Sequence, residues 1–241
     1  MQLKAVSVLS TAFLFVSAQS TQAQIVLNST SGPSRFTVGA DGVVSQPKGE
    51  FASNVGHGFG FDLFGMFKLD YKGYFNIRAD AGGLQYGREH KDASFFGITN
   101  RVSLDLLTTN NIAWGAIGPQ IMVPDGPFRP YANAAIAYTD FSTSSSLSDP
   151  TGQYQSASTQ NAHDGSHAWI FGGGFQVPFG DAGAFNLGGR YYYGGRATYL
   201  RKGDITDNPD GTITLRPRTS KTDMVLWQLG FTLTIPRATS H

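Results

Sequence analysis

Two histidines, a serine and a carboxylate stand close together in the run His163-Asp164-Gly165-Ser166-His167. A serine hydroxyl activated by an imidazole is the arrangement with which serine hydrolases attack acyl groups. The pair Glu89-His90 could add a second carboxylate and imidazole from elsewhere in the chain. The competing interpretation is a polar loop, which this Gly-, Ser- and Asp-containing composition favours. We therefore expect no catalytic residues.

Cofactor and metal chemistry has little support in the residue types. Cysteine is absent, which excludes disulfides and thiolate ligands, and the five histidines make only a weak case for a metal site. A phosphate-binding reading of the glycines at 172–174 requires a helix N-terminus directly after them, and no helix is expected there. The tyrosines at 191–193 alternate in direction along a strand and cannot form one sugar platform. We expect neither a cofactor nor a metal ion.

The first 23 residues have the organisation of a secretory signal peptide. Lys4 supplies the positive charge, an apolar stretch covers 5–16, and small residues allow cleavage after Ala18 or, as we prefer, Ala23. The apolar stretch is shorter than the roughly 20 residues that a membrane-spanning helix needs. Cleavage would leave 17 basic and 17 acidic side chains. A neutral chain of this kind argues against nucleic acid as a partner.

The rest of the chain alternates apolar and polar residues with a period of two, which predicts β-strands. Eight such segments are expected, at 35–44, 57–69, 74–87, 101–122, 128–141, 167–177, 184 to about 205, and a last one ending at Ile235. A turn at Thr109, Asn110 and Asn111 is the alternative and would give ten strands. Short turns at 70–73, 124–127 and 179–183 alternate with longer connections at 45–56, 88–100, 141–166 and around 208–211. This alternation predicts an antiparallel up-and-down transmembrane β-barrel.

The low charge content decides which face of the strands points outward. Charged residues are 15% of the chain, against about 25% in a typical soluble domain. A lipocalin-like barrel needs a polar exterior, whereas a membrane barrel places its polar residues in the lumen. The apolar faces, including Ile112, Trp114 and Ala116 in the fourth segment, are therefore expected to meet lipid. The charged residues expected in the lumen are Asp62, Lys68, Arg78, Asp80, Arg101, Asp105, Arg190 and Arg196.

Aromatic residues near the strand ends are expected to form two belts at the membrane interfaces, where a ring meets lipid chains and its polar edge meets headgroups. The upper belt is predicted from residues near the long connections, namely Trp169, Trp227, Tyr138 and Tyr193. The lower belt is predicted from residues near the short turns, namely Phe75, Phe128 and Phe185.

With the strands placed, residues 36–235 resemble the OmpA-like outer-membrane β-barrel family. The resemblance rests on QPKGEF (46–51), GPQIMVPDGPFRPYANA (118–134), FGGGFQVPFG (171–180) and the last strand. It implies a place in the bacterial outer membrane, with membrane lipid and the barrel insertion machinery as partners. The chain departs from the family at its end, where such proteins usually finish on an aromatic residue and this strand ends at Ile235. The expected organisation is a signal peptide (1–23), a lead-in (24–34), the barrel (35–235) and a tail (236–241).

The expected function is a non-enzymatic envelope or surface-interaction protein whose outer loops could hold an extracellular ligand. Two other functions remain open. A narrow pore for small solutes requires a lumen that stays wet around its arginines. A lipid-modifying outer-membrane enzyme requires Ser166 and a histidine within hydrogen-bond reach.

Overall fold

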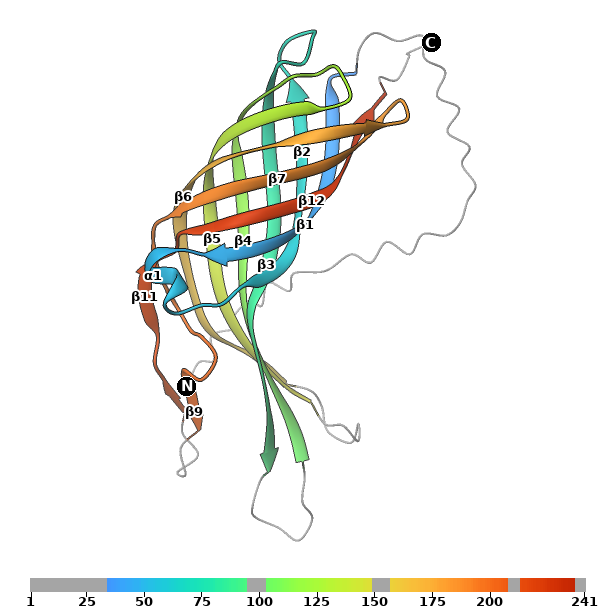
Figure 1. Ribbon diagram of the computed structural model, residues 1–241. Coiled ribbons are helices and arrows are strands. Elements are labelled where there is room, and N and C mark those ends of the chain that lie inside the picture. Colours follow the sequence, from blue (N-terminus) through green and yellow to red (C-terminus); the bar gives the residue numbers. More distant parts are fainter. Residues whose placement is uncertain (1–33, 95–102, 149–156, 208–212, 237–241) are drawn as a thin grey trace, which may run out of the picture. The chain divides into compact units, whose positions relative to one another are not determined.

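A computed structural model describes residues 34–94, 103–148, 157–207 and 213–236. Eight antiparallel strands form a closed barrel (Figure 1). Their bounds are β1 (Phe36–Pro47), β2 (Gly58–Lys68), β3 (Phe75–Ser94), β4 (Ser103–Met122), β5 (Arg129–Ser148), β6 (Ala157–Phe179), β7 (Gly183–Gly194) and β12 (Met224–Ile235). The first strand closes on the last, with Phe36 opposite Ile235 and Pro47 opposite Met224. The predicted eight-stranded barrel is confirmed, while the expected signal peptide lies outside the described residues.

The two ends of the barrel differ in their connections. The short-turn end carries the β2–β3, β4–β5 and β6–β7 turns together with the start of β1 and the end of β12. The opposite end, which we call the long-connection end, carries the short helix α1 (Gly49–Ala52) and two small hairpins. One hairpin pairs β8 (Arg196–Tyr199) with β11 (Arg218–Lys221), and the other pairs β9 (Ile205–Asp207) with β10 (Ile213–Leu215). No helix in the described ranges is long and apolar enough to cross a membrane.

The β2–β3 turn shows why the short turns are tight. The Asp70 carboxylate accepts backbone N–H groups from Gly73 at 3.0 Å, Tyr74 at 3.2 Å and Phe75 at 2.8 Å. These hydrogen bonds hold the pKa of Asp70 below its usual value. Gly73 adopts a φ of +85°, which a residue with a Cβ rarely adopts.

Several strands are longer than expected at the long-connection end. The polar stretch 141–166 was predicted as a loop, but β5 continues to Ser148 and β6 begins at Ala157. Hydroxyl pairs across the strands account for this extension, because Thr108 and Ser145 lie 2.8 Å apart through their hydroxyl oxygens. The alternative turn near Asn110 is wrong, since Asn110 is buried and accepts a 2.7 Å hydrogen bond from the Thr143 hydroxyl within a continuous β4. The seventh strand was expected to reach about residue 205 but ends at Gly194.

The direction of the β4 side chains was also predicted wrongly. Ile112, Trp114 and Ala116 were expected to face lipid, but they point into the barrel and are buried. The outward positions of this part of β4 are small or apolar, as at Gly115 and Ile117. Both faces of β4 are thus poor in charge, so polarity alone could not identify the inward one. In the other barrel strands the apolar face is directed outward as expected, as the exposure of Phe59, Trp169 and Leu229 illustrates.

Candidate functional site: the barrel lumen

The middle of the lumen holds a layer of charged side chains from several strands. Arg190 of β7 donates to both carboxylate oxygens of Asp80 on β3, at 2.8 and 3.1 Å. Arg78, also on β3, donates from Nε to Asp80 Oδ1 at 2.7 Å. All three side chains are buried. Short paired contacts between opposite charges are what a dry, packed interior requires.

Two further carboxylates complete this layer. Asp62 of β2 accepts hydrogen bonds from Trp114 Nε1 at 2.9 Å and Gln228 Nε2 at 3.0 Å, and it lies 3.3 Å from Arg78 Nη2. Asp41 of β1 accepts both of its hydrogen bonds from Asn186 Nδ2, at 2.8 and 2.9 Å.

The Arg78 guanidinium also stacks 3.7 Å from the centre of the Phe64 ring. We call Asp41, Asp62, Arg78, Asp80 and Arg190 the charged layer. Its side chains come from β1, β2, β3 and β7, so it crosses the lumen from one wall to the other.

An apolar layer lies on the long-connection side of the charged layer. Phe51 of α1 packs edge-on against Tyr199 at 5.2 Å, Phe141 at 6.0 Å and Tyr86 at 6.2 Å between ring centres. The Tyr86 hydroxyl donates to the Leu200 carbonyl oxygen at 3.0 Å, and these side chains are buried. The connection that holds α1 was expected to be a loop. Its one large apolar residue, Phe51, is the signal by which this inward-packed segment could have been found.

Several residues that the sequence placed in the lumen occupy the charged layer, namely Asp62, Arg78, Asp80 and Arg190. Lys68 lies half-buried at the short-turn end of the lumen. Arg101 lies outside the described residues, as does the side chain of Asp105. Four side chains of this network were not among the lumen residues predicted from the sequence, namely Asp41, Asn186, Trp114 and Gln228.

Arg196 is not a lumen residue, contrary to the prediction. It lies in β8 with 59% of its side chain exposed, 3.5 Å from Glu50 Oε2. The prediction assumed that β7 continues in one phase past Gly194. The strand ends there, and Gly195 leads the chain into the separate β8–β11 hairpin, so the alternation no longer applies.

The serine–histidine run does not assemble into a hydrolase-like pair. Ser166 points inward, and its hydroxyl donates to the backbone oxygen of His167 at 3.3 Å. The His167 ring points outward against Tyr138, at 5.5 Å between ring centres. His163 instead contacts Asp140, at 2.7 Å between Nδ1 and Oδ1. Within the described residues, no group of three or more histidine and acidic side chains is placed to hold a metal ion.

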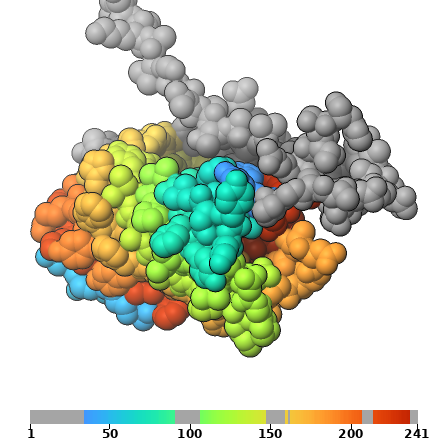
Figure 2. All heavy atoms as spheres, turned by 90° about the horizontal axis from the view of Figure 1, so that it is seen from above, coloured from blue at the N-terminus to red at the C-terminus, as the bar shows by residue number. Residues whose placement is uncertain are grey.

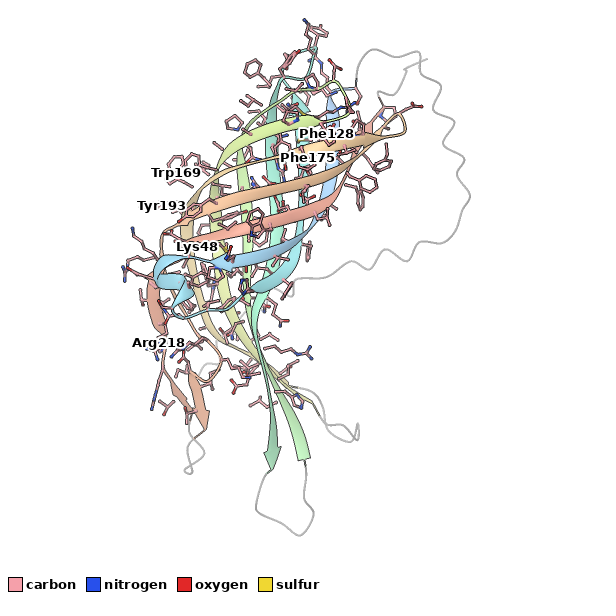
Figure 3. The ribbon with its side chains drawn as sticks, viewed as in Figure 1. Lys48, Phe128, Trp169, Phe175, Tyr193 and Arg218 are labelled. Atoms are coloured by element: carbon pink, nitrogen blue, oxygen red, sulfur yellow. The ribbon has the colours of Figure 1, made fainter. Side chains whose placement is uncertain are left out.

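The aromatic residues predicted for the membrane belts all lie on the outer surface. Trp169 of β6 is paired with Tyr193 of β7, and Figure 3 shows both on the outside of the barrel, toward its long-connection end. Phe128 and Phe175, with ring centres 6.0 Å apart, lie nearer the short-turn end. All seven predicted residues are exposed, namely Phe75, Phe128, Tyr138, Trp169, Phe185, Tyr193 and Trp227.

Comparison with known proteins identifies the fold. A scan of family models and a search of curated proteins find no match. Neisserial surface protein A is similar in structure, with a TM-score of 0.51 and 12% identity over 83% of this chain and 97% of that one. The fold is that of a small outer-membrane β-barrel.

Two other solved structures show lower similarity. Ail, the attachment invasion locus protein of Yersinia pestis, solved with the heparin analogue sucrose octasulfate, has a TM-score of 0.39 and 13% identity over 83% of this chain and 96% of that one. A major outer membrane protein from Thermus thermophilus has a TM-score of 0.41 and 13% identity over 81% of this chain and 98% of that one. At 12% identity, the similarity to Neisserial surface protein A concerns the fold alone.

Proposed function

We propose that the chain is a bacterial outer-membrane protein that acts by surface interaction rather than by catalysis. Its barrel is a closed anchor related to the OmpA-like family, inserted by the barrel insertion machinery and surrounded by outer-membrane lipid. The short-turn end faces the periplasm. The long-connection end faces the outside and carries the surface on which an extracellular ligand would bind.

The unequal length of the strands carries this proposal. β3, β4 and β5 have 20 residues and β6 has 23, whereas β1, β7 and β12 have 12 and β2 has 11. A tilted strand crosses the hydrocarbon in about 9–11 residues. The four longer strands run well past the ends of the shorter strands on one side, as the lower part of Figure 1 shows, and in the proposed arrangement this extension lies outside the membrane.

The extension has the composition of a surface in water. Its side chains include the hydroxyl pair Thr108 and Ser145 and the buried pair Asn110 and Thr143. Serines occupy 142 and 144–146 of β5. Such a polar sheet cannot lie in lipid, and a sheet held by cross-strand hydrogen bonds is a rigid platform for recognition.

The lumen argues against the pore hypothesis. The charged layer and the apolar layer around Phe51 follow each other along the lumen, and both consist of buried side chains in mutual contact. Eight strands enclose only enough space for side chains to fill. We expect the refolded protein to show no single-channel steps in a planar bilayer. Regular conductance steps from the pure protein would favour the pore instead.

Cysteine labelling of whole cells tests the orientation. The natural chain has no cysteine, so one introduced residue gives an unambiguous signal. Ser146→Cys in the β5 extension should react with a membrane-impermeant maleimide on intact cells. Lys72→Cys, in the β2–β3 turn, should react only after the outer membrane is permeabilised. Labelling of both variants, or of Lys72→Cys alone, in intact cells would contradict the proposed orientation.

A further inference from the structure

The short-turn end of the lumen contains a small cavity that the packing does not fill. Its volume is about 60 Å³. Figure 2 looks onto this end of the barrel, where the β2–β3 turn stands foremost. The polar residues that line the cavity include Thr37, Lys68, Arg129, Gln176, Thr232 and Thr234. The cavity lies inside the ring of strands, so its ligand must come from water and not from the surrounding lipid.

Two cations face this cavity together. Lys68 ends β2 and Arg129 begins β5, and their positive charges repel each other. Among the described residues, neither has a carboxylate within salt-bridge distance. The acidic residue on the cavity wall is Asp181, which is exposed in the β6–β7 turn, while Asp70 and Asp125 act on Lys68 only from the turns. Like charges held in a confined space are unfavourable unless an anion lies between them.

Unpaired hydrogen-bond donors give an independent indication. Gln176 is 3% exposed, and its Nε2 has no hydrogen-bond partner. The Arg129 Nε is also buried without a partner. The nearby Asn76 amide, in contrast, donates to the Gly73 carbonyl oxygen at 3.1 Å. A buried donor without a partner costs free energy, so the two unpaired donors at this cavity indicate that an acceptor occupies it.

We propose that this cavity binds a small tetrahedral oxyanion of the phosphate or sulfate class. A buried water needs at least about 10–15 Å³ of cavity volume, so the cavity has room for roughly four waters or one such anion. Lys68 and Arg129 supply the charge, and Gln176 Nε2 supplies a directed hydrogen bond. The Thr37 and Thr234 hydroxyls bond each other, which leaves one hydroxyl proton of this pair to donate to the anion. With the orientation proposed above, the anion enters from the periplasm. The binding itself does not depend on that orientation, so it can be tested on protein in detergent.

Isothermal titration calorimetry and thermal unfolding in a maltoside detergent, which contains no phosphate, test the site. Inorganic phosphate should bind and raise the melting temperature above that in chloride of equal ionic strength, with a saturable dependence on concentration. Lys68→Met and Arg129→Met should each weaken phosphate binding by roughly tenfold or more, because each removes a charged donor. Lys72→Met is the matched control, because Lys72 lies in the β2–β3 turn and does not line the cavity.

Each outcome decides the proposal. Saturable binding that Lys68→Met and Arg129→Met weaken, and Lys72→Met does not, supports it. Phosphate that stabilises no better than chloride would contradict the proposal, and so would phosphate binding that the cavity variants and the control weaken equally or leave unchanged. The faster migration of folded barrels on unheated gels verifies that every variant is folded. If Lys68→Met or Arg129→Met fails to fold, Gln176→Met can be tested instead, because it changes no charge. Its affinity for phosphate should also fall.

Discussion

Arg190 and Asp80 join opposite walls of the barrel through two parallel hydrogen bonds of 2.8 and 3.1 Å. In the order of strands around the barrel, β7 and β3 are separated by β6, β5 and β4 on one side and by β12, β1 and β2 on the other. Backbone hydrogen bonds connect only neighbouring strands, so this side-chain pair directly links two strands that are not neighbours in the sheet. Its two side chains are almost completely buried.

Arg190→Met should destabilise the protein strongly. The change leaves the Asp80 carboxylate with Arg78 as its remaining cation, and breaking a buried ion pair on one side costs about 3–5 kcal/mol. The free energy of unfolding in urea, measured on refolded protein in detergent, is the appropriate readout.

Arg196→Met is the matched control for that variant. Both arginines were predicted to face the lumen, but Arg196 is exposed and contacts Glu50 at the surface. Its replacement should change the free energy of unfolding by at most about 1 kcal/mol. Equal effects of the two replacements would show that the charged layer does not stabilise the barrel.

Gly82→Ala should disturb the hydrogen bond between Trp114 and Asp62. The Trp114 ring lies directly over Gly82, where a Cβ would overlap it and would also approach the Phe61 carbonyl oxygen to 2.7 Å. Overpacking of this kind costs about 1–3 kcal/mol. Gly115→Ala is the control, because its Cβ would meet nothing within 4 Å. Urea unfolding and near-ultraviolet circular dichroism should separate the two variants, and equal stability would contradict the close packing.

Phe51→Ala should loosen the long-connection end of the barrel. The ring is 1% exposed and contacts three other aromatic rings, so truncation should cost about 3–5 kcal/mol. Glu50→Ala, in the same helix, removes a surface ion pair and an exposed hydrogen bond from the Lys221 backbone N–H, and should cost about 1 kcal/mol. Both variants should remain silent in a planar bilayer because the charged layer is intact. Conductance by Phe51→Ala would show that Phe51 alone closes the lumen.

Strand periodicity and charge content were sufficient to predict the barrel, because membrane and lumen impose opposite demands on alternate residues. They identified Arg78, Asp80 and Arg190 as lumen residues for the same reason. The predicted side-chain directions are wrong where this contrast is absent. In β4 both faces are nearly uncharged, and an apolar inward layer around Trp114 is as acceptable to a packed lumen as a polar one.

The remaining errors arose at chain segments outside regular alternation. Arg196 follows two glycines that end β7, and no periodic signal marks where the chain leaves the barrel. Phe51 packs into the lumen from a helix of four residues, too short to show a helical pattern. The partners of Asp41 and Asp62 depend on which strands face each other across the lumen, which strand order determines and local sequence does not.

Stability should fall in acid partly through Asp70. Its pKa is held below 3.8 by backbone hydrogen bonds, the one from Phe75 foremost. Because the pKa of Asp70 is lower in the folded state, its carboxylate adds to the free energy of unfolding at pH values above its ordinary pKa. This contribution is lost as the pH falls through the lowered pKa of the folded state. Asp70→Asn should therefore show a weaker loss of stability below about pH 4 than the wild type, measured by urea midpoints. Asp125→Asn, in another short turn, serves as a charge-matched control, and identical acid profiles for all three proteins would contradict this role.

The depth of the tryptophans tests the position of the barrel in the membrane. Trp114 lies inside the lumen, whereas Trp169 and Trp227 lie on the outer surface. Three variants isolate the fluorescence of each residue, because each variant keeps one tryptophan and has phenylalanine at the other two positions. Amphipathic rings favour the membrane interface, and Trp169 lies opposite Tyr193 near the long-connection end. Lipids brominated near the headgroup should therefore quench Trp169 and Trp227 much more than lipids brominated near the bilayer centre. Trp114 should be quenched weakly by both, because the strand wall separates it from lipid. If lipids brominated near the bilayer centre quench Trp169 and Trp227 most strongly, these residues lie in the hydrocarbon. The membrane would then lie closer to the long-connection end, which would contradict the assignment of the β3–β6 extension to water.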